Sequence, residues 1–127
     1  MKVTRATAVL LVDVVEETRE FFKRAGFEVT MEVPACDAVG FAVFVKDGVQ
    51  VMAETKGNER EPNGIQLLTK QSRCAVVFVE VDDLDPVIAG LEGFEVAAPR
   101  HKTFYGSEEI TYQEPGGNLV TFAKFNR

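Results

Sequence analysis

Few side chains in this sequence of 127 residues could combine for nucleophilic or zinc chemistry. The chain has a single histidine, His101, and two cysteines, Cys36 and Cys74, which do not form a CxxC pair. Zinc sites usually need imidazoles or several thiolates, and a nucleophilic triad needs an imidazole base. His101 lies in the polar stretch 99–103, which is typical of a surface loop. We therefore expect neither site, and interpret Cys36 as a plain thiol in a loop.

Aromatic and acidic side chains offer a different chemistry, the binding of a small organic molecule. The chain contains 10 Phe and 2 Tyr, and its formal net charge is −6. Aromatic rings bind flat molecules by stacking and cations through their faces, and nearby carboxylates strengthen the preference for cations. The same negative charge repels phosphates, so nucleic acid is not an expected partner.

The composition, with 46% hydrophobic and 27% charged residues, is typical of a globular domain. The length fits one domain, residues 1–127. The apolar run 8–12 is too short to span a membrane and lacks the cleavage site of an export signal. We therefore expect a cytoplasmic protein with no membrane partner.

The elements that must position these side chains occur twice along the chain. Gly26-Phe27-Glu28-Val29 recurs as Gly93-Phe94-Glu95-Val96, and each copy follows a strand-like run, an acid and a helical stretch. The pattern predicts an α+β fold of two β-α-β-β-β repeats, in halves 1–55 and 74–127 joined by a linker, 56–73. Within the linker, residues 65–68 could form a short helical turn or an extra strand. Expected strands lie at 9–12, 27–33, 40–45, 49–53, 76–81, 94–98, 109–113 and 118–123.

Local signals mark where the two helices begin and end. Asp13 has Glu16 three residues on, the spacing of a capping box, and Asp85-Pro86 is typical of an N-cap followed by an N1 proline. Gly26 and Gly93 suit the left-handed position that follows a helix. We expect helices between these signals.

The most specific motif runs from Tyr105-Gly106-Ser107-Glu108-Glu109 into Glu114-Pro115-Gly116-Gly117-Asn118. With the repeat, it resembles the vicinal oxygen chelate superfamily, which includes glyoxalase I, extradiol dioxygenases and bleomycin-resistance proteins. Glu114 stands where that family usually has Asp. The resemblance implies a curled mixed sheet around a cavity, and a homodimer in which the cavity can lie across the subunit interface.

The resemblance also implies where metal ligands, usually His, Gln or Glu, would be found. Those positions hold Thr7 (or Ala6), Met52, Val76 and Thr121, none of which offers an imidazole or carboxylate. We therefore predict no metal, no cofactor and no catalytic residue of the usual type. The metal-free branch that resembles bleomycin-resistance proteins fits better than an enzyme.

Candidate ligand-binding residues follow from strand alternation and from the resemblance. With a three-residue turn at 46–48, Phe44 shares a face with Met52, and Phe78 alternates with Val76. Glu54 would be a cavity carboxylate or, as we favour, a solvated strand end, whereas Glu109 is structural or at the pocket rim. A bulge in the hairpin would turn Phe44 to the other face. For Phe78, Phe104, Tyr105 and Tyr112, core packing is at least an equally good interpretation. The full set is Phe44, Met52, Glu54, Phe78, Phe104, Tyr105, Glu109, Tyr112 and Thr121.

Three hypotheses about function follow. The first is metal-independent binding of a small aromatic or cationic molecule, including drug sequestration of the antibiotic-resistance type. The second is a metal-dependent lyase, isomerase or dioxygenase with atypical ligands such as Glu54, Glu109 and His101. The third is a dimeric scaffold or partner-binding module.

Overall fold

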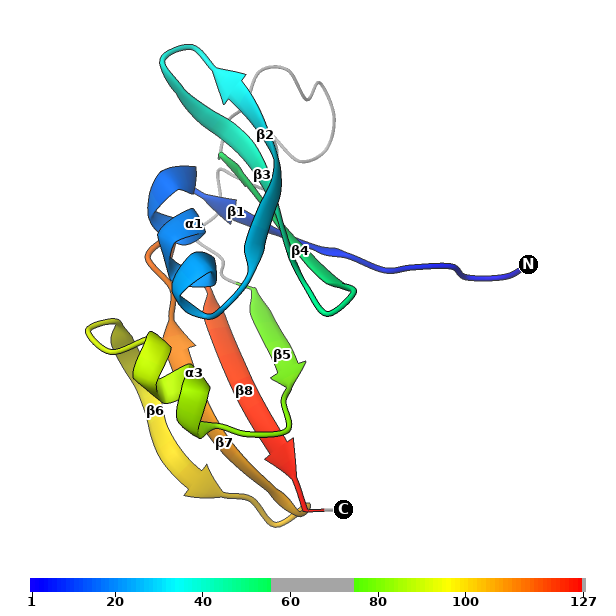
Figure 1. Cartoon of the computed structure of the whole chain (residues 1–127), viewed down its shortest axis with the longest axis vertical. Helices are drawn as coiled ribbons and strands as arrows, with labels where there is room; N and C mark the ends of the chain where they lie inside the picture. Colours follow the sequence, from blue (N-terminus) through cyan, green and yellow to red (C-terminus); the bar gives the residue numbers. More distant parts are fainter. Residues whose placement is uncertain (56–74, 127) are drawn as a thin grey trace.

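The computed structural model describes residues 1–55 and 75–126 and contains two units of β-α-β-β-β order (Figure 1). This confirms the predicted repeat and the α+β class. The predicted linker 56–73, with its turn or strand at 65–68, lies outside the described residues, as does Cys74. The elements are β1 (Ala8–Val12), α1 (Val15–Arg24), β2 (Glu28–Ala35), β3 (Ala38–Lys46), β4 (Val49–Thr55), β5 (Val76–Glu80), α3 (Asp85–Gly90), β6 (Glu95–Lys102), β7 (Ser107–Gln113) and β8 (Leu119–Phe125).

Each unit forms a four-stranded mixed sheet of the same topology. The strand order is β1-β4-β3-β2 in the first sheet and β5-β8-β7-β6 in the second. In each sheet the first strand runs parallel to the last, and the other neighbouring pairs are antiparallel. Each helix connects the two edge strands of its sheet, and the last strand of each unit lies beside its first strand.

Both the placement of charged residues and the spacing of apolar residues favour helix α1. Glu16 and Glu17 occupy the first turn and Lys23 and Arg24 the last, which suits the helix dipole. The buried side of the helix carries Val15, Thr18, Phe21 and Phe22.

The ends of α1 follow the sequence signals only in part. Gly26 has φ = +97°, as expected of the residue that ends a helix. The predicted cap at Asp13 is wrong, because Val14 is the N-cap and no side chain caps the helix. The Glu16 carboxylate instead accepts the backbone N–H of Val39 at 3.2 Å, a bond that lowers the pKa of Glu16. A tertiary contact has replaced the local one.

The second unit departs from the sequence predictions at two places. The N-cap of α3 is Leu84 rather than Asp85, and the Asp83 side chain accepts the N–H of Asp85 at 3.0 Å. Strand β6 continues to Lys102, so His101 lies in a strand opposite Glu109 and not in a loop. The pairing with β7 extends the strand through a stretch whose polarity indicated a connection.

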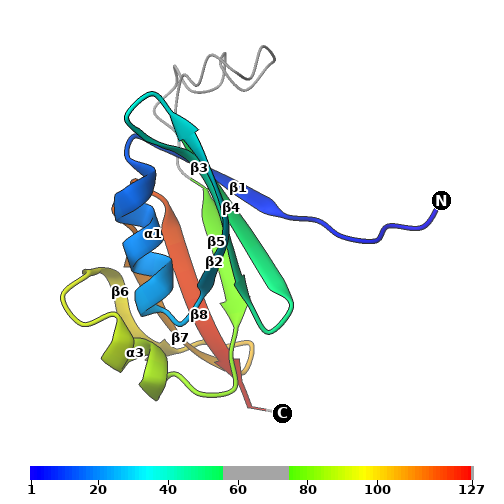
Figure 2. The same ribbon diagram turned by 45° about the horizontal axis from the view of Figure 1, so that its top comes forward.

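One hydrophobic core contains residues of both units. Helix α1 lies alongside strands of both sheets (Figure 2). The Phe22 ring stacks on Phe44 of β3, with centroids 5.0 Å apart and planes at 11°. The neighbouring Phe21 ring meets the second unit, at 5.2 Å from Phe94 and 6.2 Å from Tyr112. The first helix therefore packs against both sheets, and this packing fixes the two units relative to each other.

A buried carboxylate adds a polar link between the units. Glu114, which is 1% exposed, lies in the β7–β8 turn and accepts the Thr18 hydroxyl of α1 at 2.7 Å. It also accepts the backbone N–H groups of Gly116 and Asn118 and the side-chain amide of Asn118. These four hydrogen bonds offset the free-energy cost of removing the carboxylate from water.

Candidate functional site

The face of the second sheet that points away from the core carries most of the predicted site residues. Phe78 of β5 lies opposite Thr121 of β8, which lies opposite Thr111 of β7. Directly opposed residues share a face, so these three form one row across the sheet. Phe78 is 48% exposed and Val76, two residues earlier, is 63% exposed. Alternation along β5 thus places both on the same, open face, which agrees with the predicted alternation of Phe78 with Val76.

An exposed group of aromatic rings covers one end of this face. The ring of Phe125 lies 6.2 Å from that of Phe78 and 6.3 Å from that of Tyr105, whose ring is 5.2 Å from that of Phe104. Phe104 is fully exposed and Tyr105 is 49% exposed. We call these four residues the aromatic face. Exposed rings in contact offer a surface on which a flat molecule can stack.

Phe125 was absent from the sequence prediction, although a signal for it exists. It lies four residues after Thr121 on the same strand, and residues an even number apart in a strand share a face. Extending the alternation of β8 to its last residue would have included it.

A buried carboxylate lies beside the aromatic face. Glu109 is 6% exposed, and its Oε2 atom accepts the Tyr105 and Ser107 hydroxyls, each at 2.6 Å. The hydrogen bond to Glu109 raises the pKa of the Tyr105 phenol, because the neutral phenol is the donor. Thr103 completes the group through its hydroxyl, 2.7 Å from that of Ser107. The network holds the hydroxyl group of the exposed Tyr105 ring in place.

The positions where the family resemblance would place metal ligands do not suit a metal. Thr121 shares a hydrogen bond with Thr111, with hydroxyl oxygens 2.7 Å apart, and its partner on β5 is Phe78. In the first sheet, Met52 lies opposite Val9. Thr7 accepts a hydrogen bond from the Gln50 amide at 3.3 Å, and Val76 is a hydrocarbon. Neither these residues nor their partners across the parallel strands offer an imidazole or carboxylate, so the donor set does not fit a divalent ion.

The atypical ligands of the enzyme hypothesis are not brought together either. His101 and Glu109 are cross-strand neighbours in the second sheet, whereas Glu54 belongs to the first. Within residues 1–55 and 75–126 there is no cluster of three or more His, Cys, Asp or Glu suited to a metal ion.

Two predicted wall residues belong to the core instead. Phe44 is fully buried against Phe22 because the β3–β4 turn has two residues, with Lys46 opposite Val49, and not three. That one-residue change of register moves Phe44 to the opposite face from Met52. Tyr112 is 2% exposed and packs on Phe21 and Phe122, and burial raises the pKa of its phenol.

The open face of the first sheet holds the remaining predicted residues. Met52 is half-buried there, and Glu54 is 5% exposed, which overturns the expectation that it is a solvated strand end. Three apolar side chains on this face are exposed: Val9 at 40%, Met31 at 55% and Val33 at 37%. Both sheets therefore present an open face with apolar groups.

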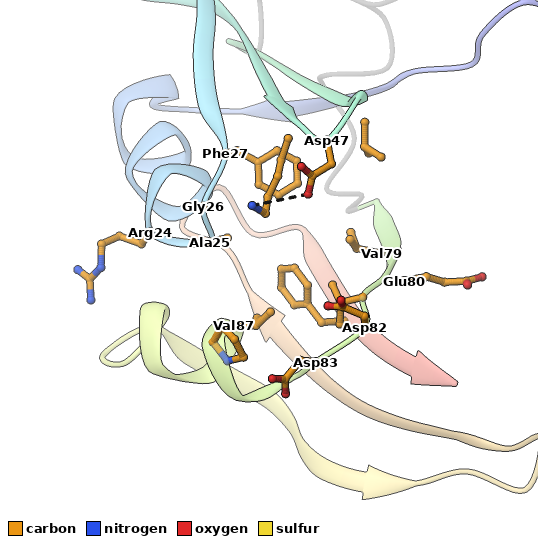
Figure 3. Close-up of a pocket in the computed structure, with 15 residues that line it drawn as sticks. Arg24, Ala25, Gly26, Phe27, Asp47, Val79, Glu80, Asp82, Asp83 and Val87 are labelled. Atoms are coloured by element: carbon orange, nitrogen blue, oxygen red, sulfur yellow. Dashed lines mark ion pairs between the residues drawn. The ribbon is translucent and has the colours of Figure 1, made fainter. Parts of the chain in front are cut away.

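A groove of about 520 Å³ lies elsewhere, where the two units meet (Figure 3). Its walls come from the end of α1, the β3–β4 turn and the segment between β5 and α3. None of the predicted ligand-binding residues lines it.

Among the described residues, no helix is both long and apolar enough to cross a bilayer.

No family model matches the sequence, and no curated protein matches it. Solved structures, however, match over nearly the whole chain.

TioX from Micromonospora sp. ML1 has a TM-score of 0.78 at 19% identity, covering 97% of this chain and 99% of its own. Lactoylglutathione lyase from Agrobacterium tumefaciens has a TM-score of 0.74 at 14% identity, covering 98% and 95%. The bleomycin resistance determinant encoded on transposon Tn5 has a TM-score of 0.70 at 13% identity, covering 98% and 100%.

These neighbours include both an enzyme and a resistance protein, so they show the fold and leave the activity open. The chain therefore has the fold of the glyoxalase and bleomycin-resistance proteins, as the resemblance in its sequence predicted.

Proposed function

We propose that this protein binds a small, flat or amphipathic organic molecule on the aromatic face without a metal ion. The observation that carries the proposal is the contact chain of Phe78, Phe125, Tyr105 and Phe104, of which Phe78, Phe104 and Tyr105 are exposed. Contiguous exposed apolar patches on protein surfaces often mark binding sites.

The surroundings of the aromatic face favour a planar cation. Ring faces attract cations, and the Glu109 carboxylate, which accepts the Tyr105 hydroxyl, adds negative charge. The chain as a whole carries a formal charge of −6, which attracts a cationic ligand at long range. The corresponding biological role is drug sequestration, a route to resistance of the kind named for the Tn5 bleomycin resistance determinant.

A homodimer completes the site in this proposal. A single chain leaves the aromatic face open on one side, and the first sheet exposes Val9, Met31 and Val33 on its own open face. If the first-sheet face of one copy covers the second-sheet face of another, both apolar surfaces are buried and two equivalent cavities are enclosed. Burial of these surfaces is the driving force for the association.

Fluorescence titration with 9-aminoacridine, a flat cation, and with bleomycin tests the site. Phe78→Ala should weaken binding of at least one of the two probes by about 5-fold or more, because one stacking ring is worth roughly 1 kcal/mol or more. The control is Val96→Ala, which truncates a side chain of similar exposure, 47%, outside the aromatic face. Equal affinity in both variants, or binding that appears only with stoichiometric Fe, Mn, Ni or Zn, would refute the proposal.

A further inference from the structure

The groove between the two units has an apolar floor made from the edge of the core. Phe27, Phe122 and Val87 reach it, although they are only 6%, 1% and 9% exposed. Val49 on the β3–β4 side is 51% exposed and widens the apolar surface. At about 520 Å³ the groove is within the size range of small-molecule sites, which are mostly apolar with a few polar groups.

The two cations that line the groove are already engaged. Arg24 points away from it (Figure 3) and donates to the carbonyls of Gly90 and Glu92 at 2.9 and 3.1 Å. Lys46 forms an ion pair with Asp47 at 3.7 Å. Neither side chain therefore forms an ion pair with Asp82 or Asp83.

Acidic groups remain in surplus at the opening. Asp47 lies on the β3–β4 turn, and Asp82 and Asp83 lie on the segment between β5 and α3 (Figure 3). Asp83 accepts the backbone N–H of Asp85, but Asp82 forms no hydrogen bond or ion pair within the part of the chain that the structure describes. An apolar floor beside the unpaired Asp82 carboxylate is complementary to a molecule with a hydrocarbon body and one positive charge.

We propose that this groove is a second ligand site, for a small organic cation with an aromatic or aliphatic body and a single ammonium group. The body lies on Phe27, Phe122 and Val87, and the ammonium group lies near Asp82. The site shares no residue with the aromatic face, so it stands or falls independently of the function proposed above.

The test uses the full chain and two probes of opposite charge, 1-naphthylmethylamine and 1-naphthoate, with amide chemical shifts as the readout. The amine should shift signals from residues 26–27, 47–49 and 79–83, and the naphthoate should bind at least tenfold more weakly. Binding of the amine should weaken at high salt, because the carboxylates are exposed to solvent.

Charge reversal at one position supplies the matched comparison. Asp82→Lys should weaken amine binding by about tenfold, and Asp82 is an exposed residue, so the change should leave the fold intact. Asp37→Lys makes the same charge change in the turn between β2 and β3 and should leave the affinity within about twofold. Phe78→Ala should also have no effect, which separates this site from the aromatic face.

Three results would overturn the proposal. The first is equal binding of the amine and the naphthoate. The second is an equal loss in the two lysine variants, which would indicate only an effect of net charge. The third is amine-induced shifts confined to the aromatic face.

Discussion

At the scale of single residues, Tyr105 combines an exposed ring with a fixed hydroxyl. Its hydrogen bond to Glu109 holds the phenol neutral, so the pKa of Tyr105 lies above the ordinary value of about 10. A raised pKa in the folded state means that the folded protein retains this proton to a higher pH than the unfolded chain does. The stabilisation is therefore complete below the ordinary value and is lost as the pH rises through the folded-state pKa.

An ultraviolet titration of tyrosine ionisation tests this assignment. In the native protein both tyrosines should ionise above the value found in denaturant, Tyr105 because of Glu109 and Tyr112 because of burial. Glu109→Gln should lower the pKa of Tyr105 alone, since the charged acceptor is lost. A Tyr112→Phe background isolates the Tyr105 signal. An unchanged titration in Glu109→Gln would contradict the hydrogen bond.

Glu114 is the residue whose loss should destabilise the fold most directly. Glu114→Ala leaves the Thr18 hydroxyl and several N–H groups without their acceptor, and should cost about 3 kcal/mol in the free energy of unfolding. Urea denaturation measures the change, and Glu95→Ala, at an exposed acid, is the control. A loss below about 1 kcal/mol would mean that water replaces the carboxylate.

At the scale of elements, the sequence predicted all eight strands and both helices that the structure describes, because alternation and terminal glycines are local signals. The sequence did not predict features that depend on contacts with distant segments of the chain. The cap expected at Asp13 gave way to a contact between Glu16 and Val39, and β6 extended through His101 because β7 pairs with it. Such contacts join segments that are distant in sequence, so no local pattern contains them.

The candidate site shows the same limit. Phe78 could be placed from alternation along β5, and the Tyr105–Glu109 pair from its motif, but Phe44 could not. Its face depended on whether the β3–β4 turn has two or three residues, and a one-residue change reverses the whole strand. The groove was not predicted, because its walls come from segments that only the packing of both units brings together.

The close approach of the two helices predicts whether Gly90→Ala raises or lowers the free energy of unfolding. A Cβ atom at Gly90 of α3 would lie 2.3 Å from the carbonyl oxygen of Arg24. Alanine normally stabilises a helix relative to glycine by about 1 kcal/mol. Gly90→Ala should instead destabilise the protein by about 1–3 kcal/mol in thermal or urea unfolding, because the backbone at Arg24 must move. A more stable variant would show that the helices do not meet this closely.

At the scale of the whole molecule, the open faces of both sheets bear on its assembly. The native mass should be that of a homodimer, and Met31→Lys on the first-sheet face should shift the protein toward the monomer and weaken 9-aminoacridine binding. Analytical ultracentrifugation measures the mass. Val96→Lys, which adds the same charge at similar exposure outside these faces, should remain dimeric. A wild-type monomer that binds the dye fully would contradict the shared cavity.

The central claim is that binding at the aromatic face needs no metal, since Thr7, Met52, Val76 and Thr121 supply no suitable ligands. The direct measurement is the affinity for 9-aminoacridine and bleomycin before and after exhaustive chelation, with metal content determined on the same samples. We predict equal affinities and no stoichiometric metal in either sample. A stoichiometric metal in the untreated protein, with binding lost on chelation and restored by that metal, would contradict the claim.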